Sequence, residues 1–426
     1  MNEESPSPTP RLSLKEKIGH GLGDTASHFV WDMAGMWALV FYADVYGIDP
    51  EVAALILLVA RLWDVVTALI MGGIVDRTKT RGDKFRPYLL WMAIPYDVLA
   101  VMTFSIPDLS PNGKAIYAGV TYMLLMTIYL AIDLSRSSLA GAMTGSSGER
   151  ASLNQYPFVF AFAGQLAVTG SALALVTFFG GGDDALGYGW TMSVFGVISV
   201  IFFFAAFLTT RERSEPPEGQ KTNLEADLKK VITTRRWVAL VGVGIISFTL
   251  FAMQAAVGAL CFTHFIDPEA KLEMLSFITS LSENEKFNIV GFIALIAATP
   301  LAKPLASRFG NRNVYIGCSI FTSTFYGLMF LQGGDQLGLI YLFDILGKIA
   351  FAPPAPLLWT MIANTADFSE WKRNRRARGL SFSASTLSMK LRWGLGGYLS
   401  ACLLGVFGDV ANQERSDAAL LGGFAS

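Results

Sequence analysis

Long apolar runs dominate this sequence and limit the folds that it can adopt. A membrane-spanning α-helix needs about 20 consecutive, mainly apolar residues, and the chain offers eleven such segments. They lie near residues 18–46, 51–75, 88–107, 114–144, 155–180, 188–210, 237–265, 288–308, 313–332, 337–366 and 379–408. Only 16% of the residues are charged, whereas a soluble domain carries about 25%. The sequence therefore predicts an all-α integral membrane protein.

Composition removes several functional classes. The chain has 33 basic and 34 acidic residues, a balance that offers no basic surface for nucleic acid. Its three cysteines, Cys261, Cys318 and Cys402, stand alone in apolar stretches without disulfide or metal-ligand spacing. The polar start of the chain lacks the short apolar core and cleavage site of a removable signal peptide. We expect no catalytic site, metal site or cofactor beyond a coupling ion.

Loop composition predicts the organisation of the chain. Residues 1–17 form a polar tail, 18–210 a first bundle of six helices, 211–236 a polar linker, and 237–426 a second bundle. Five helices are visible in that second bundle, and the twelfth is expected to be missing or truncated. The basic loops predict a cytoplasmic N-terminus in a bacterial-type inner (plasma) membrane. The strings GGIVDRTKTR and KPLASRFGNR end the second and eighth spans, a weak internal echo of two related halves.

Ionisable residues occur inside the predicted spans, where each costs at least about 2.5 kcal/mol unless it faces water or a partner. Asp24, His28 and Asp32 share one face of the first span at a spacing of four. The other spans hold close pairs: Arg61 with Asp64, Asp133 with Arg136, Asp344 with Lys348, and Lys390 with Arg392. Each pair could simply neutralise itself within its helix. Taken together, the set predicts a polar cavity between helices.

Two of these positions need a closer reading. Lys390 and Arg392 lie about 200° apart around a helix, so we expect only Lys390 to face the cavity. His28 stands between two carboxylates, and imidazole exchanges protons near neutral pH, which suits a coupled transport cycle. A histidine in an apolar helix also serves as a structural hydrogen-bond donor, and both interpretations stay open.

Several motifs carry a family resemblance. The strings ARLWD, DRTKTRGDKFRP, ERASLNQYP and ANTADFSEW occur in spans and loops along the chain. On these motifs the sequence resembles the glycoside-pentoside-hexuronide:cation symporters of the major facilitator superfamily. The resemblance implies two six-helix bundles around a central cavity, through which a sugar and a sodium ion or proton move together by alternating access. It implies as partners a small sugar, a coupling cation and the lipid bilayer.

The resemblance also implies roles for single residues. Asp64 matches the first aspartate of the family's cation motif, Asp133 the carboxylate that holds sugar hydroxyls, and Tyr129 its neighbouring aromatic residue. Lys390 matches a lysine of the polar centre. Thr67, Ala68 and Leu130 depart from the pattern, because an apolar residue replaces an oxygen ligand at the last two. A hard cation needs several oxygen ligands, so we expect protons rather than sodium, carried by Asp64 or by Asp24 and Asp32 beside His28.

Three further departures concern the sugar. His28 occupies the place of a sugar-binding aspartate, Phe158 that of an arginine, and Arg136 that of an aromatic residue. A site that loses an acid and gains a base could accept a sugar acid, whose carboxylate Arg136 or Lys390 would hold. Asp133 lies one turn from Arg136, however, and could occupy it instead.

The loop after the second span is a candidate cytoplasmic gate. Asp76, Arg77 and Arg81 lie in this basic segment and could latch the inward-facing opening. An equally good interpretation is a loop whose charge sets the topology.

Two other classes compete with sugar transport. Gly21-Leu22-Gly23-Asp24 matches the GxGD string of intramembrane aspartyl proteases, with Tyr96-Asp97 as a possible second motif. The order of the two helices is reversed relative to that family, which argues against it. A lipid-handling or non-transporting relative on the same fold is the stronger alternative, because a fold does not fix a function.

Overall fold

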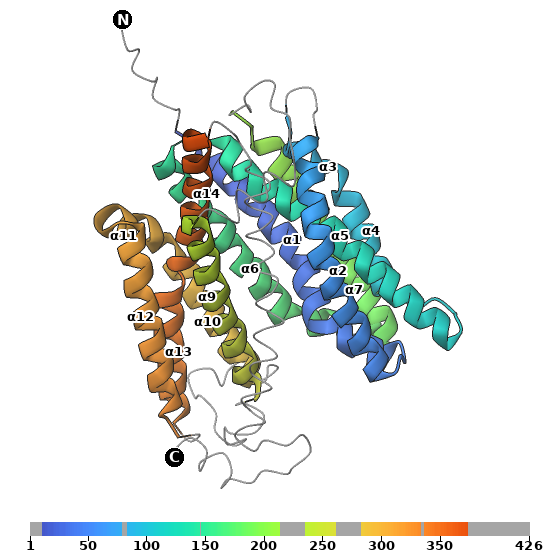
Figure 1. Ribbon diagram of the computed structural model, residues 1–426. Coiled ribbons are helices and arrows are strands. Elements are labelled where there is room, and N and C mark those ends of the chain that lie inside the picture. Colours follow the sequence, from blue (N-terminus) through green and yellow to red (C-terminus); the bar gives the residue numbers. More distant parts are fainter. Residues whose placement is uncertain are drawn as a thin grey trace, which may run out of the picture.

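The computed structural model describes residues 11–78, 83–144, 146–213, 235–260, 283–333 and 336–373. Within these residues the secondary structure is helical, and the helices run roughly alongside one another between the two ends of the molecule (Figure 1). The first helix begins, and the last described helix stops, at the same end of the molecule, which we call the upper end (Figure 1). The predicted all-α membrane fold is confirmed.

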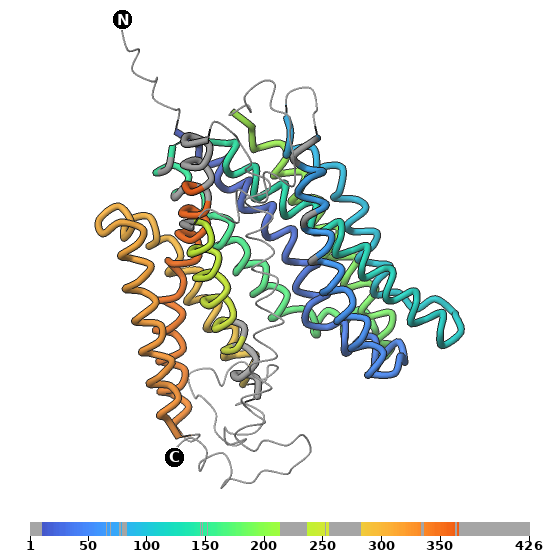
Figure 2. Tube along the Cα trace, in the orientation of Figure 1, coloured from blue at the N-terminus to red at the C-terminus, as the bar shows by residue number. Residues whose placement is uncertain are grey.

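The first group of helices comes from the N-terminal half of the chain. It comprises α1 (Leu14–Val40) with its π-helical continuation η1 (Phe41–Val45), α2 (Pro50–Arg77), α3 (Arg86–Trp91), α4 (Ala93–Thr103), α5 (Pro111–Met143), α6 (Ser147–Gly180) and α7 (Asp184–Thr209). The second group comprises α9 (Arg235–Leu260), α10 (Glu283–Ala298), η4 (Thr299–Leu301), α11 (Ala302–Phe309), α12 (Asn311–Phe330), α13 (Leu337–Phe351) and α14 (Pro354–Arg373). Figure 2 shows the two groups lying on opposite sides of the molecule.

Local sequence explains where the helices begin. Ser13 caps α1 in a capping box with Glu16, in which each side chain bonds to the other residue's backbone. Asp49 caps α2, and Ser110 caps α5, each directly before a proline whose missing N–H costs nothing at that position. Each of these helices therefore begins at a capping residue that stands just before an apolar run of the sequence.

Three predicted spans contain a short interruption of the α-helix that was not expected from the sequence, although two of them still form single membrane-length stretches, Glu283–Phe309 and Leu337–Ile362. The span at 88–107 is divided into α3 and α4 at Met92, and Pro95 follows, unable to donate to the carbonyl of Trp91. The span at 288–308 tightens into the 3₁₀ turn η4 at Pro300. The span at 337–366 is interrupted between α13 and α14, where Pro353 and Pro354 stand together. Proline explains each interruption.

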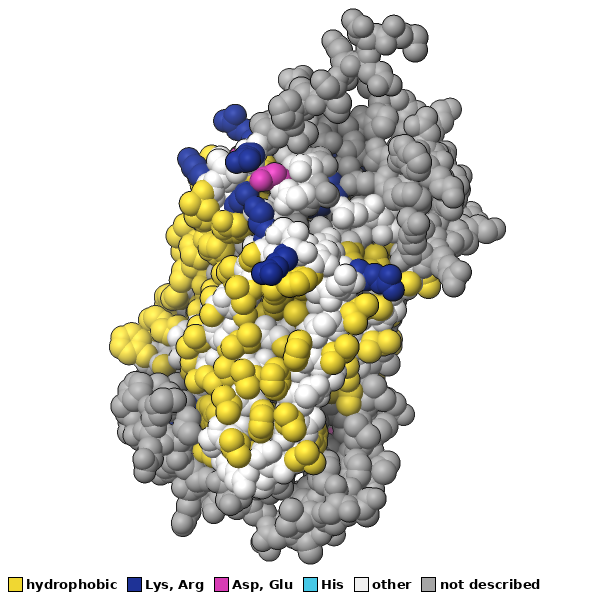
Figure 3. Space-filling view, turned by 90° about the vertical axis from the view of Figure 1, so that its left-hand side faces the viewer, with side chains coloured by type: hydrophobic (Ala, Val, Ile, Leu, Met, Phe, Trp, Pro, Cys, Tyr) yellow, Lys and Arg dark blue, Asp and Glu magenta, His cyan; other side chains and the backbone are white. Residues whose placement is uncertain are grey.

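Six helical stretches of the described residues are long and apolar enough to cross a membrane. Apolar side chains also cover the outside of the second group, where Ile316, Ile320 and Phe321 of α12 are exposed. Figure 3 shows this apolar surface with Lys and Arg side chains gathered above it. Such a surface is suited to lipid, with basic residues at the headgroup level.

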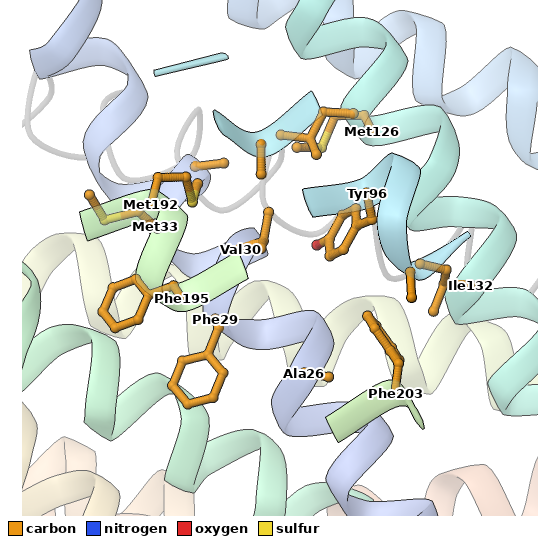
Figure 4. Packing of buried hydrophobic residues seen from close by; sticks show 14 of the residues in the cluster. Ala26, Phe29, Val30, Met33, Tyr96, Met126, Ile132, Met192, Phe195 and Phe203 are labelled. Carbon is orange, nitrogen blue, oxygen red and sulfur yellow. The ribbon is translucent and has the colours of Figure 1, made fainter. Parts of the chain in front are cut away.

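The interior of the first group forms around α1, which packs against α6 and α7. Phe29, Val30 and Met33 of α1 meet side chains of α7, α4 and α5 in one apolar cluster (Figure 4). Close packing needs small residues: a Cβ at Gly21 would lie 2.6 Å from the Phe160 ring. Because α1 is held this tightly, the polar side chains on its remaining face have fixed positions.

The two groups meet mainly through α6, which packs against α10 and α14. Towards the upper end, the Asn154 amide donates to Thr360 Oγ1 (3.1 Å), and Arg150 Nη1 donates to Asn364 Oδ1 (3.3 Å). Further along the same interface, Phe162 packs in an apolar cluster with Phe292. Polar contacts therefore join the halves near one end, and apolar contacts join them deeper in the molecule.

Candidate functional site

Arg136 is the centre of a buried cluster of charges between α1 and α5. Its Nη2 lies 2.6 Å from Asp24 Oδ1 and 2.8 Å from Asp133 Oδ1. All three side chains are largely buried, with exposed fractions of 11%, 9% and 14% for Arg136, Asp24 and Asp133. The structure thus brings together two carboxylates from different helices on a single guanidinium, and the cluster carries an excess of negative charge.

The sequence predicted only part of this arrangement. The contact between Asp133 and Arg136 follows from their i, i+3 spacing, and it was one of the two outcomes expected for Arg136. The contact with Asp24 was missed, because Asp24 was grouped with His28 and Asp32 alone. No local pattern links Asp24 to Arg136, since only the packing of α1 beside α5 creates the pair.

His28 and Asp32 form a second pair on α1. His28 Nδ1 lies 2.9 Å from Asp32 Oδ2, as their i, i+4 spacing predicts. Gly164 of α6 leaves room for the imidazole, because a Cβ there would lie 3.1 Å from His28 Cβ. The side chain of His28 is 25% exposed, so it is the more accessible member of the pair. The polar face of α1 is therefore divided between Arg136 and an internal histidine–carboxylate pair.

Aromatic residues line the same region. The Tyr129 ring stacks on the Trp31 indole with centroids 4.3 Å apart and planes 19° apart. Arg61 of α2 lies over the Trp31 ring, with its guanidinium carbon 5.2 Å from the ring centre. Tyr96 is tilted against Tyr129 at 6.3 Å. Tyr129 was predicted from the family pattern, whereas Trp31 was missed although it directly precedes Asp32.

The other candidates on α2, Asp64, Thr67 and Ala68, follow Arg61 along the same helix. Asp64 is buried, with 1% of its surface exposed. The Thr67 hydroxyl donates to the carbonyl of Trp63 (2.9 Å), so the hydroxyl hydrogen is already bound within α2. Ala68 and Leu130 lie together in an apolar cluster with Leu134. Among the described residues no group of three or more His, Cys, Asp or Glu side chains is placed to hold a metal ion.

The second group of helices buries a charged pair of its own. Lys348 Nζ lies 2.9 Å from Asp344 Oδ2 on the same helix, α13. The Gln254 amide of α9 donates to Asp344 Oδ1 (2.8 Å), and Lys348 Nζ lies 4.9 Å from the Phe287 ring centre. The pairing within one helix is the simple neutralisation that the sequence allowed. Gln254 was missed, since it belongs to another helix.

Several candidates fall where the structure says little. Lys390 and Arg81 lie outside the described residues, and the side chains of Asp76 and Arg77 at the end of α2 are likewise not described. Their roles in the substrate site and the gate stay predictions.

The described end of the loop after α2 is anchored to α7. The Glu212 carboxylate accepts hydrogen bonds from the backbone N–H groups of Lys84 (3.0 Å), Phe85 (2.7 Å) and Arg86 (2.8 Å). Glu212 was missed in the sequence. Because α3 and α7 belong to the same group of helices, this anchor holds the loop within one half of the protein.

The contacts between the halves use two of the motifs that carry the family resemblance. Arg150 and Asn154 belong to ERASLNQYP; Asn364, the partner of Arg150, belongs to ANTADFSEW, and Thr360, the partner of Asn154, lies just before that string. Beside them, Lys17 of α1 binds Glu149 (3.0 Å) and donates to Ser152 (3.0 Å). The motifs were available in the sequence, but nothing in their spacing showed that they meet across the two halves.

Comparisons with known proteins agree with this architecture. A family model described as MFS/sugar transport protein matches residues 19–424. The chain is 33% identical to a putative glycoside/cation symporter, YagG, of Escherichia coli K12, over 92% of this chain and 83% of that protein. It is 29% identical to an isoprimeverose transporter of Lactiplantibacillus pentosus, over 95% and 83% of the two chains. The solved structure of the E. coli fucose:proton symporter FucP is similar in fold, with a TM-score of 0.66, 11% identity, and coverage of 96% and 95%.

Proposed function

Because the chain belongs to the MFS/sugar transport family, we propose that it moves a neutral sugar or glycoside across the membrane together with a proton. Its family and relatives make it a multi-pass membrane transporter and not an enzyme. The observation that carries the finer proposal is the Asp24–Arg136–Asp133 cluster.

The cluster is suited to hydroxyl groups. Asp24 and Asp133 each contact Arg136 through Oδ1, so the second oxygen of each carboxylate is the atom offered to a sugar hydroxyl. The stacked rings of Trp31 and Tyr129 supply an aromatic edge of the kind that packs against the apolar face of a sugar ring. The two carboxylates and the stacked aromatic pair together support a sugar site between α1 and α5, with Lys390 as a further predicted contact.

The charge of the cluster argues for a neutral substrate. Arg136 already binds two carboxylates, so the carboxylate of a sugar acid would have to displace one of them. Asp32 adds a further acid close by, paired with His28. The sugar-acid hypothesis therefore depends on Lys390 rather than on Arg136, and we place a neutral glycoside or pentoside ahead of a hexuronide.

The same cluster supports a proton as the coupling ion. With both carboxylates ionised and Arg136 charged, the cluster bears one uncompensated negative charge inside the membrane, which is unfavourable. Protonation of Asp24 makes the cluster neutral and weakens the link between α1 and α5. We therefore place the proton on Asp24, with Asp64 as the second candidate. Because the proton changes both the charge and the contact between helices, its binding is coupled to conformation.

The contacts between the halves support alternating access. Arg150 with Asn364 and Asn154 with Thr360 join α6 to α14 towards the upper end, which the basic loops predict to be cytoplasmic. These bonds must break before a substrate can leave on that side. The described arrangement thus fits a form closed towards the cytoplasm. Rocking of the two halves would break these bonds and open the cytoplasmic side.

Proteoliposomes that contain a pH-sensitive dye test the proposal. Isoprimeverose, methyl β-D-glucuronide and lysophosphatidylcholine are added separately outside, and we expect only isoprimeverose to acidify the lumen. The Asp24→Asn variant should abolish this signal, whereas Asp64→Asn should abolish it only if the proton resides on α2. Acidification by the glucuronide alone would overturn the neutral substrate. Uptake that requires sodium and moves no protons would overturn the proton. A response to the lysolipid alone would favour the lipid-handling alternative.

A further inference from the structure

His20 is a buried titratable residue that the site described so far does not use. It lies on α1 one turn before Asp24, and the i, i+4 spacing places the two side chains on the same face of the helix. Only 2% of His20 is exposed. Its Nδ1 has no hydrogen-bond partner among the described residues. A structural histidine would normally satisfy this atom, so its position calls for another explanation.

The charged groups around His20 form a line along α1. Arg136 of α5 runs beside this part of α1, since a Cβ at Gly23 would lie 3.6 Å from Arg136 Cδ. One turn towards the upper end, Lys17 is bound by Glu149 of α6, and Glu16 is bound by Arg213 beyond the end of α7. One turn in the other direction is Asp24. His20 therefore stands between the Arg136 cluster and the ionic groups at the upper end of the molecule.

We propose that His20 relays the coupling proton from Asp24 to the upper end of the transporter, which the loop charges predict to be cytoplasmic. The inference deepens the proposed proton symport and rests on it. In the relay, the O–H bond of the protonated Asp24 carboxyl breaks and an N–H bond forms at the unprotonated ring nitrogen of His20. When the two halves open at the upper end, the imidazolium loses a proton to the water that enters there, which restores the neutral ring and leaves Asp24 as a carboxylate.

The chemistry of the neighbours suits a relay better than a store. Imidazole has two ring nitrogens, so it accepts a proton on one side and releases one on the other near neutral pH. Burial disfavours an imidazolium at His20, and the nearby Arg136 guanidinium repels it as well. A proton that reaches His20 is therefore driven onward. When it has left, the restored Asp24 carboxylate binds Arg136 again, and the transporter returns to its starting charge.

The test separates net proton release from sugar movement. The His20→Asn variant is compared with wild type in proteoliposomes for two rates, uptake of labelled isoprimeverose driven by an inward proton gradient, and exchange of isoprimeverose at equal pH. Exchange needs no net release of the proton. If the glucuronide is the sugar that acidifies wild-type vesicles, labelled methyl β-D-glucuronide is used in both assays. We expect gradient-driven uptake to fall at least about tenfold, as for loss of a positioned acid–base group, and exchange to stay within about twofold.

A matched control is available on the same helix. Thr25 is also buried on α1, where its hydroxyl donates to the Phe160 carbonyl (2.7 Å), and Thr25→Val removes a buried polar group without removing a titratable one. This variant should change the two rates equally. Gradient-driven uptake by wild type should rise as the pH on the releasing side is raised, and His20→Asn should lose this dependence.

Each outcome decides the inference. Equal losses of uptake and exchange in His20→Asn, or uptake within about twofold of wild type, would overturn the relay. These results differ from failure of the proposed function, in which wild-type protein itself would show no proton-driven uptake of either sugar.

Discussion

The two halves of the protein each bury acidic and basic side chains, but they arrange them differently. In the N-terminal half, Arg136 binds carboxylates from two helices, α1 and α5. In the C-terminal half, Lys348 binds Asp344 on its own helix, and the Gln254 amide supplies a further, uncharged contact. The first cluster therefore depends on how two helices lie relative to each other, and the second moves as part of α13.

This difference bears on which cluster responds to a proton. The N-terminal cluster has one acid more than it has bases, so protonation brings it to neutrality and loosens a contact between helices. The C-terminal pair is balanced, so protonation of Asp344 would leave Lys348 as an uncompensated charge in the membrane. A proton-coupled movement is thus stabilised in the first cluster and opposed in the second. We regard the N-terminal cluster as the working site and the C-terminal pair as a structural one.

The largest effect is expected from Arg136→Gln. Two buried carboxylates would lose their shared cation, and the loss of one partner from a buried ion pair costs about 3–5 kcal/mol. If a cost of this size falls on the transport cycle, gradient-driven sugar uptake in proteoliposomes should fall more than about 100-fold, since about 1.4 kcal/mol corresponds to a factor of ten. Arg136→Lys should retain part of the uptake, because an ammonium keeps the charge but lacks the planar fork. Uptake at the wild-type rate in Arg136→Gln would remove this cluster from the mechanism.

The second prediction tests the structural role of the C-terminal pair. Lys348→Met leaves Asp344 buried without its cation, and the protein should lose about 3–5 kcal/mol of stability. The double variant Asp344→Leu with Lys348→Met should recover most of this stability, as measured by thermal unfolding in detergent. It should also transport sugar.

The matched variant in the other half sharpens the contrast. Asp24→Asn and Asp133→Asn combined with Arg136→Gln remove all charge from the N-terminal cluster, yet gradient-driven uptake should remain absent. If instead this triple variant transports and the C-terminal double variant does not, the roles assigned to the two halves are reversed.

The third prediction concerns the glycine that accommodates Lys348. A Cβ at Gly291 would lie 2.0 Å from Lys348 Nζ, so Gly291→Ala must displace the ammonium from Asp344. We expect a loss of about 1–3 kcal/mol in stability, typical of overpacking. Gly317→Ala on α12 is the control, because nothing lies within 4 Å of its Cβ. Equal melting temperatures for the two variants would show that Lys348 moves aside without cost.

Apolar run length was enough to predict the helices, and spacing within a helix was enough to predict contacts along it. His28 with Asp32 and Asp344 with Lys348 are both i, i+4 pairs, and both form. Contacts between helices were beyond the sequence, because the rotation of each helix about its axis is set by packing. Asp24 meets Arg136 because α1 packs beside α5, where a Cβ at Gly23 would lie 3.6 Å from Arg136 Cδ.

The interruptions of the helices were also missed, although the prolines were visible. Pro157 lies inside α6 without ending it, whereas Pro300 stands in a 3₁₀ turn. A proline weakens the helix in both places, and the surrounding packing decides whether the axis continues. Sequence alone therefore marks such positions as candidates for a break without distinguishing the two outcomes.

The smallest effect is expected at the contact between the halves. Asn154→Ala removes the hydrogen bond to Thr360 Oγ1, which contributes about 1 kcal/mol, and so shifts the balance between the two forms of the transporter about fivefold. Spin labels at cysteines replacing Arg211 and Arg308, both exposed, would report the separation of the halves near the upper end. The longer distances should become more populated in the variant.

The control for this shift lies on the same helix. The Ser171 hydroxyl donates to the Ala167 carbonyl within α6, so Ser171→Ala removes a hydrogen bond without touching the other half. Its distance distribution should match that of the unsubstituted protein. An unchanged distribution in Asn154→Ala as well would mean that the closure at this end depends on other contacts, with Arg150 and Asn364 the next pair to test. A shift in Asn154→Ala alone would identify Asn154 of α6 and Thr360 of α14 as parts of one gate, formed between halves that bury their charges in different ways.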